Sequence, residues 1–195
     1  MSRIRRLPED TINRIAAGEV VERPASAVKE LVENAIDAKA SQIDVSLGAG
    51  GKTLILIEDN GHGMNGEELS LAVERHATSK LPEGDGGDRM FRIASLGFRG
   101  EALPSIGAVA HLSIVSRTLD GETAYEIRVD GGKLGKVKPA AGKRGTRVDV
   151  RDLFSATPAR LKCLKPDRAE TTAASDLSPT VPVAHSTTGF IIVAH

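Results

Sequence analysis

The residues best suited to chemistry form the short stretch Asp59-Asn-Gly-His-Gly63, which follows an apolar run typical of a β-strand. A carboxylate at a strand end is a hydrogen-bond acceptor, and Asp59 could accept a bond from the exocyclic amine of a purine. Gly61 and Gly63 carry no side chain and would leave room for the ring. Turn chemistry alone also explains the pattern, because Asp, Asn and Gly are common in tight turns.

A carboxylate and an amide lie one helical turn apart in the segment before this loop. Residues 24–38 open with Pro24, which suits a first helical turn, and apolar residues then recur with helical period. This stripe consists of Val28, Leu31, Val32, Ala35 and Ile36. Glu30, Asn34 and Asp37 fall together on the opposite side. They are either the solvated side of an amphipathic helix or part of a ligand site that the following loop completes.

Two further segments, residues 76–80 and 95–103, could bind an anion. The second segment places two glycines directly before a predicted helix over residues 101–109. Backbone amides at a helix start, approached by a flexible glycine segment, form a natural anion site. Lys80 and Arg99 could add positive charge beside a triphosphate.

Three other kinds of site are excluded by spacing. Residues 48–53 look like the end of a phosphate-binding P-loop, but Ser46 stands where the first glycine is required, and the segment joins two strands. The chain has no Rossmann fingerprint of strand, Gly-rich turn and helix. Cys163 and the five histidines lack the spacing of metal ligands, so we expect no structural zinc site.

The elements that must position these residues are helices and strands with hairpin turns between them. A helix is predicted after Asn65, its N-cap, with Glu68 completing a capping box, and another from the Thr157-Pro158 cap to Lys165. Strands are predicted over residues 42–47, 52–59, 111–117, 124–129 and 145–150. The second of these is apolar on both faces, which favours a central position. The pattern predicts an α+β fold, a two-layer sandwich of helices on a mostly antiparallel sheet.

Composition bounds the remaining possibilities. The chain has 195 residues, with 26 Lys and Arg against 26 Asp and Glu. Residues 133–168 carry 11 basic and three acidic side chains, which form either a solvated face or a contact with the phosphates of DNA. No apolar run approaches 18 residues and no signal peptide is present, so we expect no membrane contact. A single cysteine, Cys163, fits a reducing compartment, and we expect a soluble cytoplasmic protein.

Six motifs resemble the N-terminal ATPase domain of the MutL DNA mismatch repair family. In order along the chain they are Ile15-Ala-Ala-Gly-Glu-Val-Val-Glu-Arg-Pro-Ala25, Lys29-Glu-Leu-Val-Glu-Asn34, Asp59-Asn-Gly-His-Gly63, Arg75-His-Ala-Thr-Ser-Lys80, Leu96-Gly-Phe-Arg-Gly-Glu-Ala-Leu103 and Thr157-Pro-Ala-Arg160. The wider superfamily of gyrase, the Hsp90 chaperone, histidine kinases and MutL shares the Bergerat ATP-binding fold. The last two motifs resemble MutL and not the other members.

This resemblance implies a role for each matching residue. Glu30 would be the general base that orients and polarises the attacking water, and Asn34 would hold Mg²⁺ against the phosphates. Asp59 would bind the adenine amine, with Thr146 beside it. The ATP lid and the phosphate contacts would be formed by Thr78, Ser79, Lys80, Gly97, Phe98, Arg99, Gly100 and Glu101. The implied cofactors are therefore ATP and Mg²⁺, which suit a reaction that depends mainly on positioning and charge neutralisation.

The resemblance also divides the chain. Residues 1–170 correspond to the Bergerat-type ATPase domain, and 171–195 form a diverged or truncated C-terminal segment, where Pro179 and Pro182 would break a helix. The second domain of the family, which contributes a lysine to the γ-phosphate, is missing, as is the C-terminal dimerisation domain. We therefore expect a truncated product that keeps the nucleotide pocket and turns ATP over slowly.

Two functions stay open at this point. The first is the ATPase module of a MutL-like mismatch repair protein, cytoplasmic and at the nucleoid during repair. In this module ATP closes the lid, the N-terminal arm up to about Val20 forms a homodimer, and mismatch recognition and downstream repair proteins receive the signal. The second is a nucleotide-binding fragment or non-functional remnant, whose pocket lacks the lysine of the missing domain.

Overall fold

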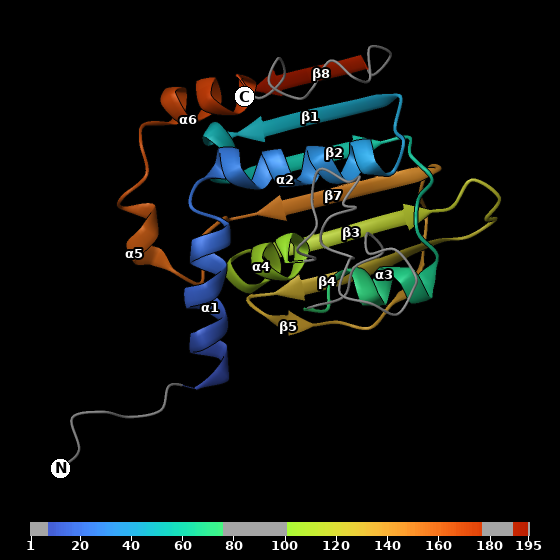
Figure 1. Ribbon diagram of the computed structural model, residues 1–195, viewed down its shortest axis with the longest axis horizontal. Coiled ribbons are helices and arrows are strands. Elements are labelled where there is room, and N and C mark those ends of the chain that lie inside the picture. The colour runs from blue at the N-terminus through green and yellow to red at the C-terminus, as the bar shows by residue number, and fades with distance from the viewer. Residues whose placement is uncertain (1–7, 76–100, 177–188, 195) are drawn as a thin grey trace, which may run out of the picture.

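A computed structural model describes residues 8–75, 101–176 and 189–194 (Figure 1). Its helices are α1 (Glu9–Val20), α2 (Pro24–Asp37), the 3₁₀ turn η1 (Ala49–Gly51), α3 (Gly66–Ala72), α4 (Ala102–Val109), α5 (Pro158–Leu161) and α6 (Asp167–Ser175). Its strands are β1 (Gln42–Gly48), β2 (Leu54–Asp59), β3 (His111–Arg117), β4 (Ala124–Asp130), β5 (Lys133–Leu134), β6 (Lys138–Ala140), β7 (Gly145–Arg151) and β8 (Gly189–Ala194).

The strands form a single sheet with the order β5-β4-β3-β7-β2-β1-β8, and β6 pairs with β4 beside β5. The pairs β1–β2, β2–β7, β7–β3 and β3–β4 are antiparallel, whereas β8 runs parallel to β1. Strand β2 lies inside the sheet between β7 and β1, as its two apolar faces predict. The predicted α+β sandwich with a mostly antiparallel sheet is confirmed.

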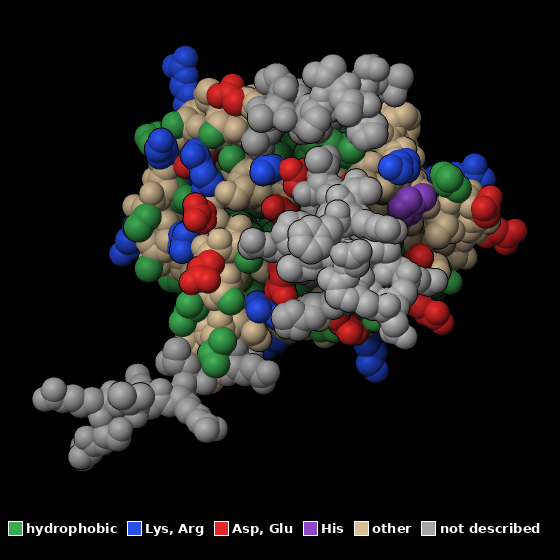
Figure 2. Space-filling model, viewed as in Figure 1, with side chains coloured by type: hydrophobic (Ala, Val, Ile, Leu, Met, Phe, Trp, Pro, Cys, Tyr) green, Lys and Arg blue, Asp and Glu red, His purple; other side chains and the backbone are tan. Residues whose placement is uncertain are grey.

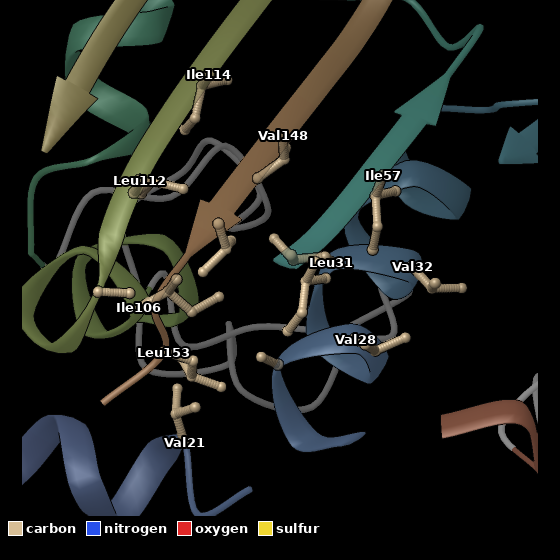
Figure 3. Close-up of a cluster of buried hydrophobic side chains, with 14 of the residues drawn as sticks. Val21, Val28, Leu31, Val32, Ile57, Ile106, Leu112, Ile114, Val148 and Leu153 are labelled. Atoms are coloured by element: carbon tan, nitrogen blue, oxygen red, sulfur yellow. The ribbon is translucent and has the colours of Figure 1, made fainter. Parts of the chain in front are cut away.

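Helices α2, α3 and α4 cover one face of the sheet (Figure 1). Side chains on a strand alternate between faces, and the residues that face the helices are the buried ones. In β2, for example, Ile55 and Ile57 are fully buried while Leu54 and Leu56 are partly exposed. Figure 3 shows Leu31 of α2 near Ile57, with Ile114 and Val148 continuing the same core across the sheet. Burial of each such side chain contributes about 1.5–3 kcal/mol.

Helix α3, the first after the loop at Asp59, begins as predicted, and so does α5, which is shorter than predicted. Asn65 accepts hydrogen bonds from the backbone of Glu67 and Glu68, and the Glu68 side chain accepts from Asn65 N–H, which completes the capping box of α3. The predicted helix that runs to Lys165 instead ends at Leu161, as α5. The hydroxyl of Thr157 makes no capping hydrogen bond to this helix. Its Oγ1 is buried and has no hydrogen-bond partner in the described part of the chain.

Several elements lie outside the sequence prediction. Helix α1 occupies the predicted N-terminal arm, and α6 spans the proposed boundary at residue 170. Strand β8 brings residues 189–194 into the same sheet as the rest of the chain, and the short strands β5 and β6 extend the opposite edge. None of the described helices combines the length and the apolar character needed to cross a bilayer.

Candidate functional site

Three polar side chains end the otherwise apolar face of the sheet that packs against the helices. Asp59 points to the same side as Ile57 because it lies two positions after Ile57 along β2. In the register of the sheet, Asp59 pairs with Thr146 of β7, and Thr146 pairs with Ser116 of β3. These three side chains therefore form a row across adjacent strands at one end of the core.

The hydroxyl of Ser116 organises this row. It accepts a hydrogen bond from the backbone N–H of Met64 at 2.8 Å, and it lies 3.1 Å from the carbonyl of Gly145 and 2.9 Å from Oγ1 of Thr146. A serine hydroxyl has one proton. If that proton goes to Gly145, the Thr146 hydroxyl must donate its proton to Ser116, and its oxygen then remains available as an acceptor. Ser116 was missed in the sequence, although a polar residue at an inward position of a strand was the available signal.

Asp59 is half-buried, and it is held by backbone donors. Its Oδ1 accepts a hydrogen bond from Gly61 N–H at 2.8 Å, and the backbone of Thr146 provides another bond. Burial raises the pKa of Asp59, while these two bonds and the nearby His62 oppose the rise. A carboxylate accepts about four hydrogen bonds, so Asp59 keeps capacity for a donor that arrives with a ligand.

The loop after Asp59 packs against the C-terminal end of α2. His62 N–H donates to the carbonyl of Ala38 at 2.9 Å, and a Cβ on Gly61 would lie 2.7 Å from that carbonyl oxygen. Gly63 has a φ of +67°, and its Cβ would lie 2.1 Å from the carbonyl oxygen of Arg117. A Cβ at either glycine would thus meet the protein's own backbone, and the room for a purine ring beside these glycines stays a prediction. The glycines allow the loop to pass between α2 and β3.

This packing sets the polar side of α2 beside the loop. The predicted apolar stripe is confirmed, since Val28, Leu31 and the rest of the stripe are buried. Glu30 and Asn34 are half-buried on the side away from this stripe. Asn34 lies one turn before Ala38, and its carbonyl accepts from Ala38 N–H at 2.9 Å. The structure therefore brings the end of α2 that carries Asn34 to the loop that carries Asp59.

Glu101 is the N-cap residue of α4, and it forms an ion pair with Arg75 at 3.8 Å. The remaining predicted phosphate contacts lie outside the described residues, and they are Thr78, Ser79, Lys80, Gly97, Phe98, Arg99 and Gly100. In the described part of the chain, no group of three or more His, Cys, Asp or Glu side chains could hold a metal ion. A cation at Asn34 would consequently need ligand oxygens from a bound molecule.

The fold and the sequence together define the family to which the chain belongs. A sequence model of the histidine kinase-, DNA gyrase B- and HSP90-like ATPases matches residues 22–139, and the chain belongs to this family. It is also 61% identical over 190 residues to the DNA mismatch repair protein MutL of Azorhizobium caulinodans, and 56% identical over 189 residues to that of Allorhizobium ampelinum. Each alignment covers 97% of this chain and 30% of the relative.

Solved structures agree with this likeness. The ATPase domain of Aquifex aeolicus MutL complexed with ADP superposes with a TM-score of 0.72 at 30% identity, over 90% of this chain and 61% of that chain. The N-terminal domain of a DNA repair protein superposes with a TM-score of 0.76 at 29% identity, over 94% and 52% of the two chains. The resemblance to the MutL ATPase domain is confirmed. The chain spans about 30% of the length of the curated relatives it matches.

Proposed function

We propose that this chain is an ATP-binding and ATP-hydrolysing module of a MutL-like mismatch repair protein. The observation that supports this most directly is the row of Asp59, Thr146 and Ser116, set against the C-terminal end of α2. Asp59 accepts the adenine amine in this proposal, and the Thr146 hydroxyl lies next to it. The similar ATPase domain of Aquifex aeolicus MutL is described as complexed with ADP, which supports nucleotide binding by this fold.

Hydrolysis needs the residues of α2. Glu30 orients and activates the attacking water as general base, and Asn34 contributes one oxygen ligand to Mg²⁺. The single amide at Asn34 fits this ion, which commonly takes one or two protein ligands and completes its shell with phosphates and water. The ion would supply charge neutralisation at the phosphates. Glu101 and the predicted phosphate residues between 78 and 100 surround the triphosphate.

The wider role follows from the similarity to MutL proteins. ATP closes the lid, the N-terminal arm forms a homodimer, and this state signals to mismatch recognition and downstream repair proteins. We place the protein in the cytoplasm, which the single exposed Cys163 supports.

Contact with DNA through residues 133–168 has weaker support. Several basic side chains of this stretch pair with acidic residues elsewhere, such as Lys138 with Glu126 and Arg147 with Glu58. Arg160 lies over the ring of Phe154. Figure 2 shows acidic and basic side chains interspersed on the visible face. A direct contact with DNA therefore stays a prediction for the exposed Lys143, Arg144 and their neighbours.

Calorimetry with a non-hydrolysable ATP analogue and Mg²⁺ tests the proposed site. We expect Asp59→Ala and Asn34→Ala to weaken binding by about 10–150-fold, the range for a lost hydrogen bond to a charged group. Glu126→Gln is the matched control, because this carboxylate lies on the opposite face of the sheet. The affinity of this variant for the ATP analogue should stay within about twofold of the wild-type value. Folding of each variant is checked by circular dichroism.

Binding that survives in Asp59→Ala, or a folded wild-type chain that binds no analogue, would contradict the proposed function. Glu30→Gln separates binding from catalysis. It should bind the analogue like wild type and release phosphate from ATP at least about 100-fold more slowly, because a positioned general base contributes roughly that much.

A further inference from the structure

Strand β8 forms one edge of the sheet, and its composition differs from that of the opposite edge. It consists of Gly189-Phe-Ile-Ile-Val-Ala194, six residues without a charge or a proline. The opposite edge is formed by the two residues of β5 and the three of β6, which include Lys133, Lys138 and Pro139. Short strands, lysine and proline are common means of keeping the edge of a sheet from pairing with another strand. Of the two edges in the described part of the chain, only the one at β8 lacks all three.

Within the residues that the structure describes, the backbone of β8 is paired on one side only. Its neighbour is β1, with which it runs parallel from the pair Gln42 and Gly189 to the pair Leu47 and Ala194. The N–H and C=O groups on the other side of an edge strand form a row of donors and acceptors that fits one further strand. An extended strand of the same sequence offers the same row, so it can complete the hydrogen bonds of β8 when it runs antiparallel.

Side chains of β8 make one face of the sheet apolar beside this edge. Ile191 and Val193 are 54% and 41% exposed. They pair with Asp44 and Ser46 of β1, which alternate with the buried residues of that strand, so both point to the face away from α2. Leu56 of β2 pairs with Ser46 and is partly exposed on this same face. The exposed apolar surface of the face therefore borders the edge at β8.

Farther from β8, ion pairs cover this face of the sheet. Arg147 of β7 pairs with Glu58 of β2, and Arg151 pairs with Asp149 on the same strand. These charged groups have partners within the chain, and covering them with a second protein would cost desolvation. A second protein would gain more at β8, because the exposed side chains of this strand are apolar.

We propose that β8 is a dimerisation edge, at which a second copy of this chain adds its own β8 in the antiparallel direction. Such an interface is isologous, because the same surface serves both copies. With Ile192 at the two-fold axis, Ile191 of each copy lies opposite Val193 of the other, so the exposed apolar side chains of both copies meet on one face. Since β8 carries no charge, its pairing with itself sets no like charges opposite each other. This inference does not depend on the nucleotide site.

Sedimentation analysis of the whole chain without nucleotide tests this pairing. A six-residue edge buries much less than the roughly 1,600 Å² of a standard interface, so we expect a dissociation constant of about 1–100 μM. Ile191→Lys places an ammonium group of each copy in the interface and should raise this constant at least about tenfold. Circular dichroism, and calorimetry with the non-hydrolysable ATP analogue AMP-PNP, check that the variant keeps its fold.

Ile15→Lys is the matched control, because Ile15 is also 54% exposed and lies on α1, away from β8 (Figure 1). Its dissociation constant should stay within about twofold of the wild-type value. A wild-type chain that stays monomeric at concentrations above this range would overturn the proposal. An equal loss of association in Ile15→Lys and Ile191→Lys would overturn it too.

Disulfide cross-linking tests the register of the two strands. In a chain whose exposed Cys163 is replaced by serine, Ile191→Cys and Val193→Cys are made separately and then mixed. Opposite residues of antiparallel strands have Cα atoms about 4.5–5.5 Å apart, which a disulfide can bridge, whereas the two copies of residue 191 would lie diagonally at about 7–8 Å. We therefore expect the mixture to cross-link and each variant alone to stay largely free of cross-links. No cross-link in the mixture, or equal cross-linking in each variant alone, contradicts the proposed pairing.

Discussion

A carboxylate belongs to the surroundings of each end of helix α2, and the two carboxylates are held in different ways. At the N-terminal end, Glu170 of α6 is only 2% exposed and accepts both Nε and Nη2 of Arg23, the N-cap residue of α2, at 3.1 and 3.0 Å. Its other oxygen accepts from Lys165 N–H at 3.1 Å. At the C-terminal end, half-buried Asp59 accepts backbone N–H groups from Gly61 and Thr146.

We interpret the difference as that between a structural carboxylate and the carboxylate to which the proposed function assigns a ligand. Glu170 is matched by a cation from its own chain and by a backbone amide, so the protein itself satisfies its charge. Asp59 receives neutral donors, and burial leaves its pKa raised in spite of them. A carboxylate in this condition gains most from a further hydrogen-bond donor, which the amine of a purine would provide. One end of the helix is thus fixed by an ion pair within the chain, and the other end lies at the proposed nucleotide site.

The largest effect should come from removing the structural carboxylate. Glu170→Ala leaves Arg23 without its partner and opens a cavity, and we expect a loss of about 3–5 kcal/mol in the free energy of unfolding. Urea unfolding followed by circular dichroism measures this loss. The control is Asp167→Ala, which lies on α6 like Glu170. Asp167 also forms an ion pair, with Lys52 at 2.9 Å, but its side chain is 59% exposed. It should cost less than about 1 kcal/mol. Equal losses in the two variants would remove the contrast between the two ends of α2.

Replacing the carboxylate at the other end should affect binding and spare stability. Asp59→Asn is expected to weaken AMP-PNP binding by about 10–150-fold, equivalent to about 1.5–3 kcal/mol. The same substitution removes a charge that burial disfavours, so the free energy of unfolding at neutral pH should equal or exceed that of wild type. Calorimetry and urea unfolding on the same preparations check both statements. A less stable variant would mean that Asp59 is structural like Glu170.

A smaller effect on stability and binding is expected when the hydroxyl of Ser116, the neighbour of Thr146, is removed. Ser116→Ala removes the acceptor for Met64 N–H and the partner of Thr146, and should cost about 1–2 kcal/mol of unfolding free energy. Binding of AMP-PNP should weaken severalfold, because the Thr146 hydroxyl is no longer oriented. Ser113→Ala is the matched control on the same strand. Ser113 bonds to Glu126 on the opposite face, and Glu126 retains Arg128 and Lys138, so binding should not change.

The smallest effect is a pH dependence of opposite sign at two carboxylates. Burial raises the pKa of Asp59, so the ionised form weakens the fold, and the stability advantage of Asp59→Asn over wild type should grow as pH rises through that pKa. Burial alone would also raise the pKa of Glu126, but bonds from Arg128, Lys138 and Ser113 lower it overall. The stability that Glu126 provides should be lost as pH falls through its pKa. Urea unfolding of wild type, Asp59→Asn and Glu126→Gln between about pH 3 and 7 tests both signs.

Local patterns predicted the elements that carry the site. Helix α2 follows from its apolar stripe, and β2 from its apolar run and the turn residues after it. Helix α6 was missed because its Ala- and Thr-rich sequence lacks such a stripe, and its position depends on Glu170 meeting Arg23, 147 residues earlier. Helix α1 lacks a side-chain cap at Pro8, and its Ile12 and Ile15 are exposed rather than buried. Helix α1 packs against α4, and no pattern in the local sequence of α1 predicts this contact.

The site itself was predictable where a motif names a residue, and not where the sheet register brings residues together. Asp59 was named from its place at the end of a strand and Thr146 from the resemblance, and the structure sets them opposite each other on neighbouring strands. Ser116 became apparent only from the register of β3 with β7. The role of the glycines also needed the structure, because the oxygens that exclude a side chain at Gly61 and Gly63 come from distant segments.

The parallel pairing of β8 with β1 has a consequence for how the chain acquires its fold on the ribosome. Strand β1 can form its hairpin with β2 early, because the two strands are close in the sequence. Its other neighbour, β8, is synthesised much later, since Gln42 pairs with Gly189. At about 5–20 residues per second, the intervening stretch of about 150 residues takes roughly 10–30 s to emerge. During that time the outer edge of β1, with its unpaired N–H and C=O groups, is open to other strands. We therefore expect nascent chains of this protein to be most prone to wrong strand pairing before β8 emerges.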